Sequence, residues 1–327
     1  MKKILKPLVA AVLAASPLLA RAGVLTVQSP NNNEFVGATT DIKVQTSQGF
    51  TKVTVTANIV KQGGGASTTL TTDIFPDGDG KGNGTMTWNA GGSFPEGLYD
   101  ITVTATSDDT FWNTEVRTVT LDTTKPKFTT FSPTDGSFFN WTIDITATLT
   151  ESNGIKQWRV TVDGNDIPNN TGTSLNIDVP FTPANDEDDG PRKIKIEAKD
   201  LAGNTASVEF TINLDRQPPK IVVTYPRSDF RVRPNSNLAV TIEITDATNT
   251  AVDVSAVVVE LRDMDDNLIR RVARRSYQPI SDTAVRWAGR VRMDVGNRTR
   301  VKIVVRATDR AGNAGVTQEI ELQVGRR

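Results

Sequence analysis

The chain has 327 residues, of which 37% are hydrophobic, enough to build packed cores in two or three domains and too many for a disordered polymer. Its formal net charge of −1 excludes a field that would draw the whole molecule to nucleic acid. The sequence has no His and no Cys, which excludes imidazole and thiolate metal ligands, Cys nucleophiles, disulfides and the usual general base beside a catalytic Ser.

Residues 1–22 have the pattern of a secretory signal peptide. Three lysines precede an apolar segment at 8–20, and an A-x-A cleavage site ends at Ala22. A buried or membrane-spanning helix is the alternative, but the segment is short and Pro17 interrupts it. We therefore predict an exported protein, periplasmic or extracellular at the cell surface, whose mature chain starts near Gly23.

The heptad Ala-x-Asp-x-Ala-Gly-Asn occurs twice, at 198–204 and 307–313, and a looser copy ends in SDDTFWN at 107–113. Each copy follows a run in which apolar and polar residues alternate, which is the pattern of a half-buried strand. The chain is therefore a tandem repeat. We predict that the apolar members of these runs face inward: Ile101, Val103, Ile194, Ile196, Ile303 and Val305.

Other landmarks recur in the same order. Each unit opens with an apolar stretch that ends in proline, and the first two close in the linkers LDTTKPK and LDRQPPK. Proline cannot extend a sheet ladder, so these segments predict boundaries. The predicted parts are a signal peptide at 1–22 and domains at 23–123, 124–219 and 220–327.

Each domain is expected to contain about seven strands, the spacing of a β-sandwich. In the second domain they are predicted near 128–131, 142–149, 155–162, 167, 174–179, 193–198 and 206–214. The segment LIRRVARR at 268–275 has a weak helical period, but we interpret it as a strand.

The heptad predicts a hairpin between the last two strands of a domain. Asp caps a turn, Gly adopts positive φ without steric cost, and Asn tolerates the left-handed region. Tyr99 lies where a tyrosine corner is expected, whereas Arg192 and Val301 occupy that place in the other units. Trp158 shares a strand face with valines and is predicted to lie in a core.

The D-L-A-G-N and D-R-A-G-N turns, the L-D-x-x-x-P linkers and the segment from Trp88 to Val103 resemble bacterial immunoglobulin-like domains. Such domains occur in tandem in exported surface proteins and as accessory modules of secreted enzymes. The resemblance covers nearly all of the mature chain and implies an all-β fold of three tandem immunoglobulin-like β-sandwiches. It implies a spacer, an adhesin, a carbohydrate binder or an assembly subunit.

We accordingly predict a non-catalytic structural or adhesive protein of the bacterial envelope, with a protein or an envelope glycan as partner and no catalytic residues. A glycosidase carboxylate pair cannot be located from strands alone, and no pair stands out by its spacing. Nucleic acid is excluded as a partner, because the basic residues lack interleaved aromatics. The sequence shows no LPxTG motif, hydrophobic tail or second membrane span, so no transmembrane anchor is expected.

Oxygen ligands are predicted to gather at the two linkers, because the loop between strands two and three and the last hairpin share one end of such a sandwich. Clusters made only of oxygen ligands suit Ca²⁺, which is a possible and not a required ion. The alternative is that these side chains only cap turns, and Arg216 would oppose a cation at the second linker. The residues are Asp122, Glu151, Asn153, Asp200 and Asn204 at the first linker, and Asp215, Asp246, Asn249, Asp309 and Asn313 at the second.

Two further loops merit interpretation. PDGDGKGNG at 76–84 has the D-x-D beginning of a calcium loop, but Lys81 stands where an oxygen ligand is wanted, so we interpret it as a turn.

Phe111 and Trp112, with Asp108 and Asp109 beside them, are a candidate platform for a sugar or a protein. The alternative is that these aromatic rings fold back over the sandwich.

Charge differs between the predicted domains. Residues 23–123 hold 5 basic against 11 acidic side chains, 124–219 hold 9 against 14, and 220–327 hold 19 against 13, so the net charges are −6, −5 and +6. Ends of opposite charge favour head-to-tail self-association, or contact of the basic end with an anionic polymer. The alternative is that the basic residues only form a solvated strand face. The basic side is concentrated in Arg270, Arg271, Arg274 and Arg275.

Overall fold

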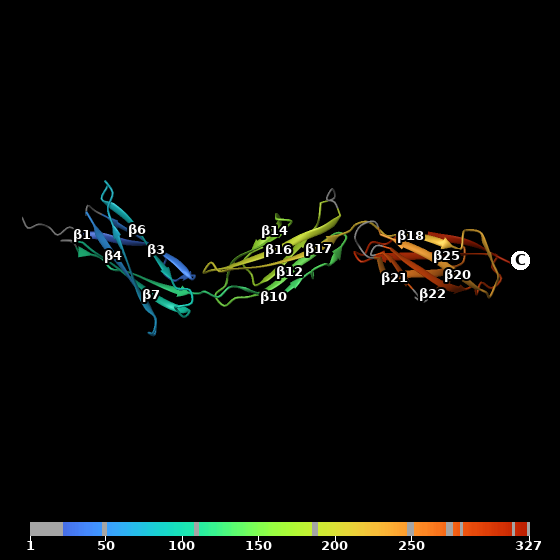
Figure 1. Cartoon of the computed structure of the whole chain (residues 1–327), viewed down its shortest axis with the longest axis horizontal. Helices are drawn as coiled ribbons and strands as arrows, with labels where there is room; N and C mark the ends of the chain where they lie inside the picture. The colour runs from blue at the N-terminus through green and yellow to red at the C-terminus, as the bar shows by residue number, and fades with distance from the viewer. Residues whose placement is uncertain are drawn as a thin grey trace, which may run out of the picture. The chain divides into compact units, whose positions relative to one another are not determined.

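The computed structural model describes residues 22–47, 51–107, 111–184, 189–246, 252–272, 277–281, 284–315 and 318–325. Within these ranges the regular elements are 26 β-strands and no helix (Figure 1). The strands form six sheets, which pair into three two-layer sandwiches with one hydrophobic core each. The all-β prediction of three tandem immunoglobulin-like sandwiches is therefore confirmed. Apart from Ala22, the predicted signal peptide lies outside the described residues.

The chain divides into two compact units. The first ends at Thr124 and also takes in the turn Leu201–Asn204, and the second comprises the rest of the described chain from Lys125. The first unit contains one sandwich and the second contains two.

The sandwich of the first unit has sheets in the orders β6-β3-β1-β8 and β2-β9-β7-β4-β5. Its strands are β1 (Ala22–Ser29), β2 (Glu34–Val36), β3 (Thr39–Ser47), β4 (Val53–Lys61), β5 (Ser67–Ile74), β6 (Lys81–Asn89), β7 (Gly97–Thr106), β8 (Phe111–Trp112) and β9 (Glu115–Leu121).

The first sandwich of the second unit has sheets in the orders β10-β12-β15 and β11-β17-β16-β13-β14. Its strands are β10 (Lys127–Ser132), β11 (Phe138–Phe139), β12 (Ile143–Thr150), β13 (Ile155–Val162), β14 (Asn165–Gly172), β15 (Asn176–Phe181), β16 (Gly190–Asp200) and β17 (Thr205–Leu214). The seven strands predicted here are all present, and the two-residue β11 is additional.

The C-terminal sandwich has sheets in the orders β18-β20-β24-β23 and β19-β26-β25-β21-β22. Its strands are β18 (Lys220–Tyr225), β19 (Phe230–Val232), β20 (Asn237–Thr245), β21 (Val252–Arg262), β22 (Leu268–Val272), β23 (Tyr277–Ser281), β24 (Ala284–Arg292), β25 (Arg300–Asp309) and β26 (Gln318–Val324). The strand predicted in LIRRVARR is confirmed as β22 up to Val272, and the segment at 273–276, with Arg274 and Arg275, lies outside the described residues.

The recurring prolines mark the point where the chain changes sheet. Pro30, Pro133 and Pro226 follow β1, β10 and β18 through cis peptide bonds. The next strand of each sandwich then pairs in parallel with the last strand of the opposite sheet: β2 with β9, β11 with β17 and β19 with β26. Proline ends the first ladder because it lacks the N–H that the ladder requires.

The predicted inward register is confirmed. All six side chains, Ile101, Val103, Ile194, Ile196, Ile303 and Val305, are fully buried. They come from β7, β16 and β25, each of which pairs with a strand on either side, so one face of each strand covers the core.

Aromatic side chains complete the cores. Trp158 is buried, as predicted, and Trp88 and Trp287 hold central positions in the other two sandwiches. The Tyr99 hydroxyl donates a hydrogen bond of 2.7 Å to the carbonyl oxygen of Pro95, which confirms the tyrosine corner. Burial raises the pKa of the Tyr99 hydroxyl.

The turn predicted at 76–84 is present up to Gly80, whereas residues 81–84 already belong to β6. The Asp77 carboxylate accepts hydrogen bonds of 3.1 Å from the backbone N–H groups of Asp79 and Lys81. Lys81 is also the first residue of β6, so the loop leads directly into the sheet. The Asp77 side chain therefore closes the turn in the way that Asx turns do.

Candidate metal site at the second linker

The repeated heptad forms the hairpins β16–β17 and β25–β26, as predicted. Gly203 and Gly312 adopt φ values of 94° and 93°, which only glycine adopts without strain. The prediction for the asparagines is wrong, because neither Asn204 nor Asn313 is among the residues with positive φ. Their side chains are instead committed to hydrogen bonds with the linker.

Both asparagine amides donate to main-chain carbonyls of the preceding linker. Asn204 Nδ2 lies 3.0 Å from the Asp122 oxygen and 3.1 Å from the Thr124 oxygen. Asn313 Nδ2 lies 2.8 Å from the Asp215 oxygen and 3.4 Å from the Gln217 oxygen. One amide thus bridges residues i and i+2 of the linker, and the same contact occurs at both linkers. We call this contact the asparagine clamp.

The linker aspartates fold the chain into the shape that the asparagine clamp requires. Asp122 Oδ1 accepts a hydrogen bond of 3.0 Å from the Thr124 N–H, and Asp215 Oδ1 accepts one of 3.0 Å from the Gln217 N–H. Such Asx turns bring the carbonyls of residues i and i+2 to one side of the chain. The capping role predicted as the alternative is therefore present at both linkers.

The looser third copy of the heptad keeps its asparagine and uses it on a strand. Asn113 Nδ2 donates to the carbonyl oxygen of Leu25 at 2.9 Å, and Asn113 Oδ1 accepts from the Leu25 N–H at 2.8 Å. Leu25 lies in β1, the first strand of that sandwich. In all three sandwiches, then, the asparagine that ends the heptad holds the chain that enters the sandwich.

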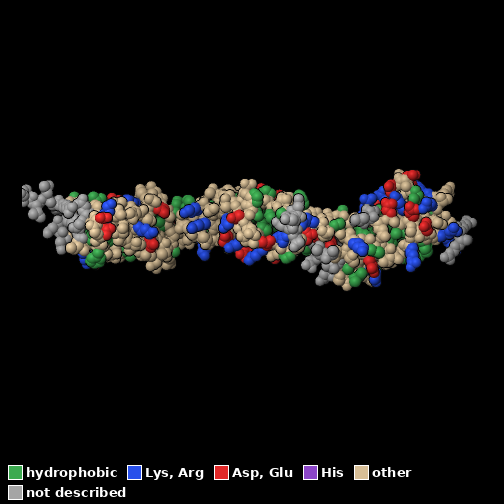
Figure 2. Space-filling model, turned by 90° about the horizontal axis from the view of Figure 1, so that it is seen from above, with side chains coloured by type: hydrophobic (Ala, Val, Ile, Leu, Met, Phe, Trp, Pro, Cys, Tyr) green, Lys and Arg blue, Asp and Glu red, His purple; other side chains and the backbone are tan. Residues whose placement is uncertain are grey.

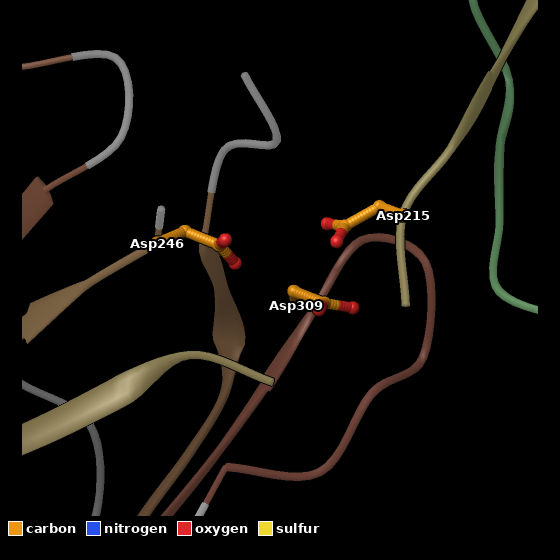
Figure 3. A group of neighbouring side chains, drawn as sticks. All are labelled: Asp215, Asp246 and Asp309. Atoms are coloured by element: carbon orange, nitrogen blue, oxygen red, sulfur yellow. The ribbon is translucent and has the colours of Figure 1, made fainter. Parts of the chain in front are cut away.

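Three carboxylates meet at the second linker. Oxygen atoms of Asp215, Asp246 and Asp309 all lie within 4.8 Å of one another, and the three residues are 1%, 5% and 3% exposed. Figure 3 shows the carboxylates of Asp215 and Asp246 pointing toward one another, with Asp309 beside them. We call these three residues the aspartate triad.

The sequence places each member of the triad directly after or at the end of a strand. Asp215 follows β17, Asp246 follows β20, and Asp309 is the last residue of β25. Three of the residues predicted for calcium at this linker are thus brought together. Asn313 lies next to them, because its backbone N–H donates to Asp309 Oδ1 at 2.8 Å and its Nδ2 donates to Asp309 Oδ2 at 2.7 Å. Asn249 lies outside the described residues.

The electrostatics of the triad favour a cation. Like charges a few ångströms apart repel strongly when they are withdrawn from water, and a divalent ion replaces that repulsion with attraction. Carboxylate oxygens are the ligands that Ca²⁺ prefers, and each oxygen has two lone pairs, so a capping hydrogen bond leaves room for coordination.

Arg216 was expected to oppose a cation here, but its charge is matched elsewhere. Its Nε lies 2.9 Å from Asp189 Oδ1, and its Nη1 donates to the Ala184 carbonyl at 3.1 Å. The Asp189 side chain is only 8% exposed, so this ion pair is largely withdrawn from solvent. The guanidinium charge is therefore largely neutralised by Asp189.

The residues predicted for the first linker are each engaged in local structure. Asp122 is 1% exposed and Asp200 is fully buried, and Glu151 Oε1 accepts a hydrogen bond of 3.0 Å from the Asn153 N–H. Asp122 belongs to the first unit, whereas Glu151, Asn153 and Asp200 belong to the second. A metal site at this linker stays a prediction.

The aromatic pair near the first hairpin is partly described. Trp112 is half-buried, its Nε1 donates to Ser107 Oγ at 3.0 Å, and a Cβ on Gly23 would lie 2.6 Å from its ring. Trp112 thus packs over β1. Asp108, Asp109 and the side chain of Phe111 lie outside the described residues, so the platform itself stays a prediction.

Comparison with known proteins gives the following. No protein-family model matches the chain, and no curated protein matches it. The described residues contain no helix with the length and apolar character needed to cross a membrane.

Solved structures do match. Fibronectin(III)-like modules of Clostridium thermocellum CbhA are 17% identical over 61% of this chain and 93% of theirs, with a TM-score of 0.37. A tetra-tandem repeat from the extending region of a large adhesion protein is 17% identical over 93% and 74%, with a TM-score of 0.29. The chicken CNTN1 FN1-FN3 domains are 11% identical over 94% and 100%, with a TM-score of 0.33. At these identities the likeness says nothing about ligand or activity.

Proposed function

Taking the chain as a tandem set of immunoglobulin-like sandwiches, we propose that it is a non-catalytic structural or adhesive protein of the bacterial envelope, exported to the periplasm or the cell surface. The observation that carries the proposal is the asparagine clamp, made by Asn204 on one linker and Asn313 on the other. A linker whose backbone carbonyls are bound by an asparagine of the following sandwich suits a protein that serves as a spacer between its modules.

The use of polar residues supports a structural role. The heptad residues and linker aspartates serve turns and linkers, and other carboxylates pair with arginine or lysine, as Asp189 does with Arg216 and Glu260 does with Arg262. The sequence supplies no His and no Cys for acid–base or nucleophilic work. Such a use of polar residues suits a protein that acts as a spacer or a binding surface better than one that catalyses a reaction.

Export is supported by residues 1–22, which carry the charge, the apolar segment and the A-x-A site of a signal peptide. Fractionation of the bacterium that encodes the chain, together with N-terminal sequencing of the recovered protein, tests this. We expect the protein in the periplasmic, surface or secreted fraction with a new N-terminus near Gly23. Recovery from the cytosol with Met1 intact would contradict the proposal.

The structural role itself is tested by comparing the encoding strain with a deletion strain. We expect the deletion to change attachment or envelope integrity, and we expect restoration by the full chain but not by a chain that lacks the C-terminal sandwich. A spacer needs all its modules, whereas an enzyme requires only the module that holds its active site. Full restoration by the shortened chain would contradict the proposal.

We further propose that the aspartate triad binds Ca²⁺. Binding would exchange carboxylate repulsion for attraction and so stiffen the linker region. The support at the second linker is the mutual distance and burial of the three carboxylates.

The alternative proposal is a carbohydrate-binding accessory protein that uses Phe111 and Trp112, with Asp108 and Asp109 nearby. A glycan array probed with the chain and with its Trp112→Ala variant distinguishes this from a purely structural role. Loss of a glycan signal in the variant, with an unchanged melting temperature, would favour the accessory role. Because Trp112 packs on Gly23, a lowered melting temperature would instead indicate a structural tryptophan.

A further inference from the structure

The C-terminal sandwich carries a cleft of about 600 Å³ that is separate from the aspartate triad. It lies between β22, the edge strand of one sheet, and β24 of the opposite sheet. Asn237, at the start of β20, also lines it. Four arginines line it: Arg270, Arg271, Arg290 and Arg292.

A glycine takes an inward position in the lining of this cleft. Along β24 the inward residues are Val285, Trp287, Gly289 and Val291, so one position in the row has no side chain. The Trp287 ring extends over that position, and a Cβ on Gly289 would lie 2.5 Å from it. Trp287 is only 2% exposed, and its ring lines the cleft together with Gly289.

The cleft holds more positive charge than its own carboxylates balance. Arg270 and Arg292 share Asp294, and Arg271 shares Glu260 with Arg262. Arg290 makes no ion pair with any of the residues that the structure describes, and it is exposed. A bound anion can therefore reach Arg290 without breaking an existing pair. Figure 2 shows Lys, Arg and acidic side chains gathered together on the C-terminal sandwich.

We propose that this cleft binds an oligosaccharide that carries carboxylate groups, such as a chain of uronic acids. A guanidinium presents its N–H groups in a planar fork that matches a carboxylate, and the side-chain amide of Asn237 can serve sugar hydroxyls. The volume is within the range of roughly 300–1,000 Å³ that small-molecule sites occupy. The inference deepens the proposed envelope role, on which the choice of a glycan rests.

The lining disfavours other anions. Single-stranded nucleic acid is bound by stacking its bases on exposed aromatic faces, and the one aromatic ring that the described residues contribute to this lining is the buried Trp287. Peptides usually add apolar anchors to their charged contacts, and the one aliphatic side chain that the described residues contribute to the cleft is the half-buried Val272. A sugar ring with one carboxylate per residue needs neither.

The test is titration calorimetry of the full chain with trigalacturonate at low salt. We expect binding that weakens as salt rises, and at least about tenfold weaker binding to the Arg290→Gln variant, since one charge-assisted contact is lost. Arg227→Gln removes the same charge from an exposed position on the same sandwich and is the matched control, expected to bind as the wild type does. Both variants are expected to keep the wild-type melting temperature.

Several outcomes would overturn the proposal. These are no binding of trigalacturonate at millimolar concentration, equal losses in the Arg290→Gln and Arg227→Gln variants, or equally tight binding of the methyl-esterified trisaccharide. Binding of hexaglutamate as tight as that of trigalacturonate would replace the glycan with an acidic peptide. The calorimetry measures binding of a purified ligand, so a negative result would refute the cleft proposal without contradicting the envelope role. Conversely, recovery of the protein from the cytosol would contradict the envelope role without changing a measured affinity.

Discussion

The side-chain amide of Asn313 donates a hydrogen bond of 2.8 Å to the main-chain oxygen of Asp215, three residues before the first proline of the second linker. The same amide reaches the Gln217 oxygen and the Asp309 carboxylate. One neutral side chain therefore joins the linker to the last hairpin of the following sandwich. This contact is the most direct target for mutation.

Asn313→Ala is expected to lower the free energy of unfolding by about 1 kcal/mol, because the part-buried hydrogen bond to the Asp215 carbonyl is lost. It is also expected to speed proteolysis of the linker at 215–219. Urea denaturation followed by tryptophan fluorescence and limited proteolysis measure the two effects. Asn297→Ala changes an exposed asparagine of the same sandwich and serves as the control. Equal stability and cleavage in the two variants would show that the asparagine clamp is dispensable.

Calcium is expected to raise the melting temperature of the wild type. A site with a Kd of about 0.1 mM adds about 1.4 kcal/mol at about 1 mM calcium. Asp246→Asn removes one charge from the triad, so the calcium shift is expected to disappear while stability in chelator stays equal or rises. Differential scanning calorimetry with calcium and with chelator measures both.

The control for the calcium experiment is Asp229→Asn, which changes an exposed aspartate of the same sandwich. Its calcium shift is expected to match that of the wild type. A melting temperature that does not respond to calcium, or an Asp246→Asn variant that is less stable in chelator, would leave the triad as a set of turn caps.

Tyr99→Phe is expected to cost about 1 kcal/mol, since it removes the hydrogen bond to the Pro95 carbonyl and leaves the ring in place. The ring keeps its contact with Trp88, whose centroid lies 5.1 Å away. Chemical denaturation of the first unit measures the loss. Tyr225→Phe, at an exposed tyrosine, is expected to change nothing. A neutral result at Tyr99 would show that the corner adds no stability.

Acid is expected to remove the stability that Glu260 provides. Burial raises the pKa of this carboxyl, but hydrogen bonds from Arg262 and Arg271 outweigh burial, and the net pKa is lowered from 4.5. Because the folded-state pKa lies below the unfolded one, the stabilisation is present above about pH 4.5 and is lost as pH falls through the folded-state value.

Comparing the wild type with Glu260→Gln tests the sign of this effect. The stability difference is expected to be largest at neutral pH and to shrink in denaturation curves recorded below about pH 4.5. Glu243→Gln breaks an exposed pair with Arg286 and is expected to have little effect at any pH. A difference that grows in acid would contradict the assignment.

Self-association, where it occurs, is expected to weaken as salt rises. The predicted first and third domains carry net charges of −6 and +6, and salt screens their attraction. Sedimentation at about 20 mM and about 500 mM salt, which differ several-fold in Debye length, measures the effect. Association that strengthens at high salt would indicate an apolar interface.

The fold was predictable because it depends on local signals. Alternation before each heptad fixed the inward face of β7, β16 and β25, and proline fixed where the first strand of each sandwich ends. Three members of the second-linker set were also predictable, since Asp246 and Asp309 stand at strand ends of the C-terminal sandwich and Asp215 directly follows the last strand of the sandwich before it.

The asparagine clamp and the arginine cleft were not predictable in the same way. A left-handed Asn and a clamping Asn look alike in sequence, and only the position of the linker carbonyls separates them. The cleft is lined by β22 of one sheet and β24 of the other, and a period-two pattern does not say which residues of the other sheet lie across from a given position. The recurrence of Asn113, Asn204 and Asn313 was the one available signal.

The asparagine clamp binds backbone oxygens, so it depends little on which side chains stand between Asp and Pro. The linkers TTKP and RQPP differ at most positions and still accept the same bond. A gene encoding such modules can therefore gain or lose a copy by recombination within the linker without redesigning the joint. Length would then evolve faster than the modules themselves, and related chains are expected to differ in the number of sandwiches before they differ in the asparagine.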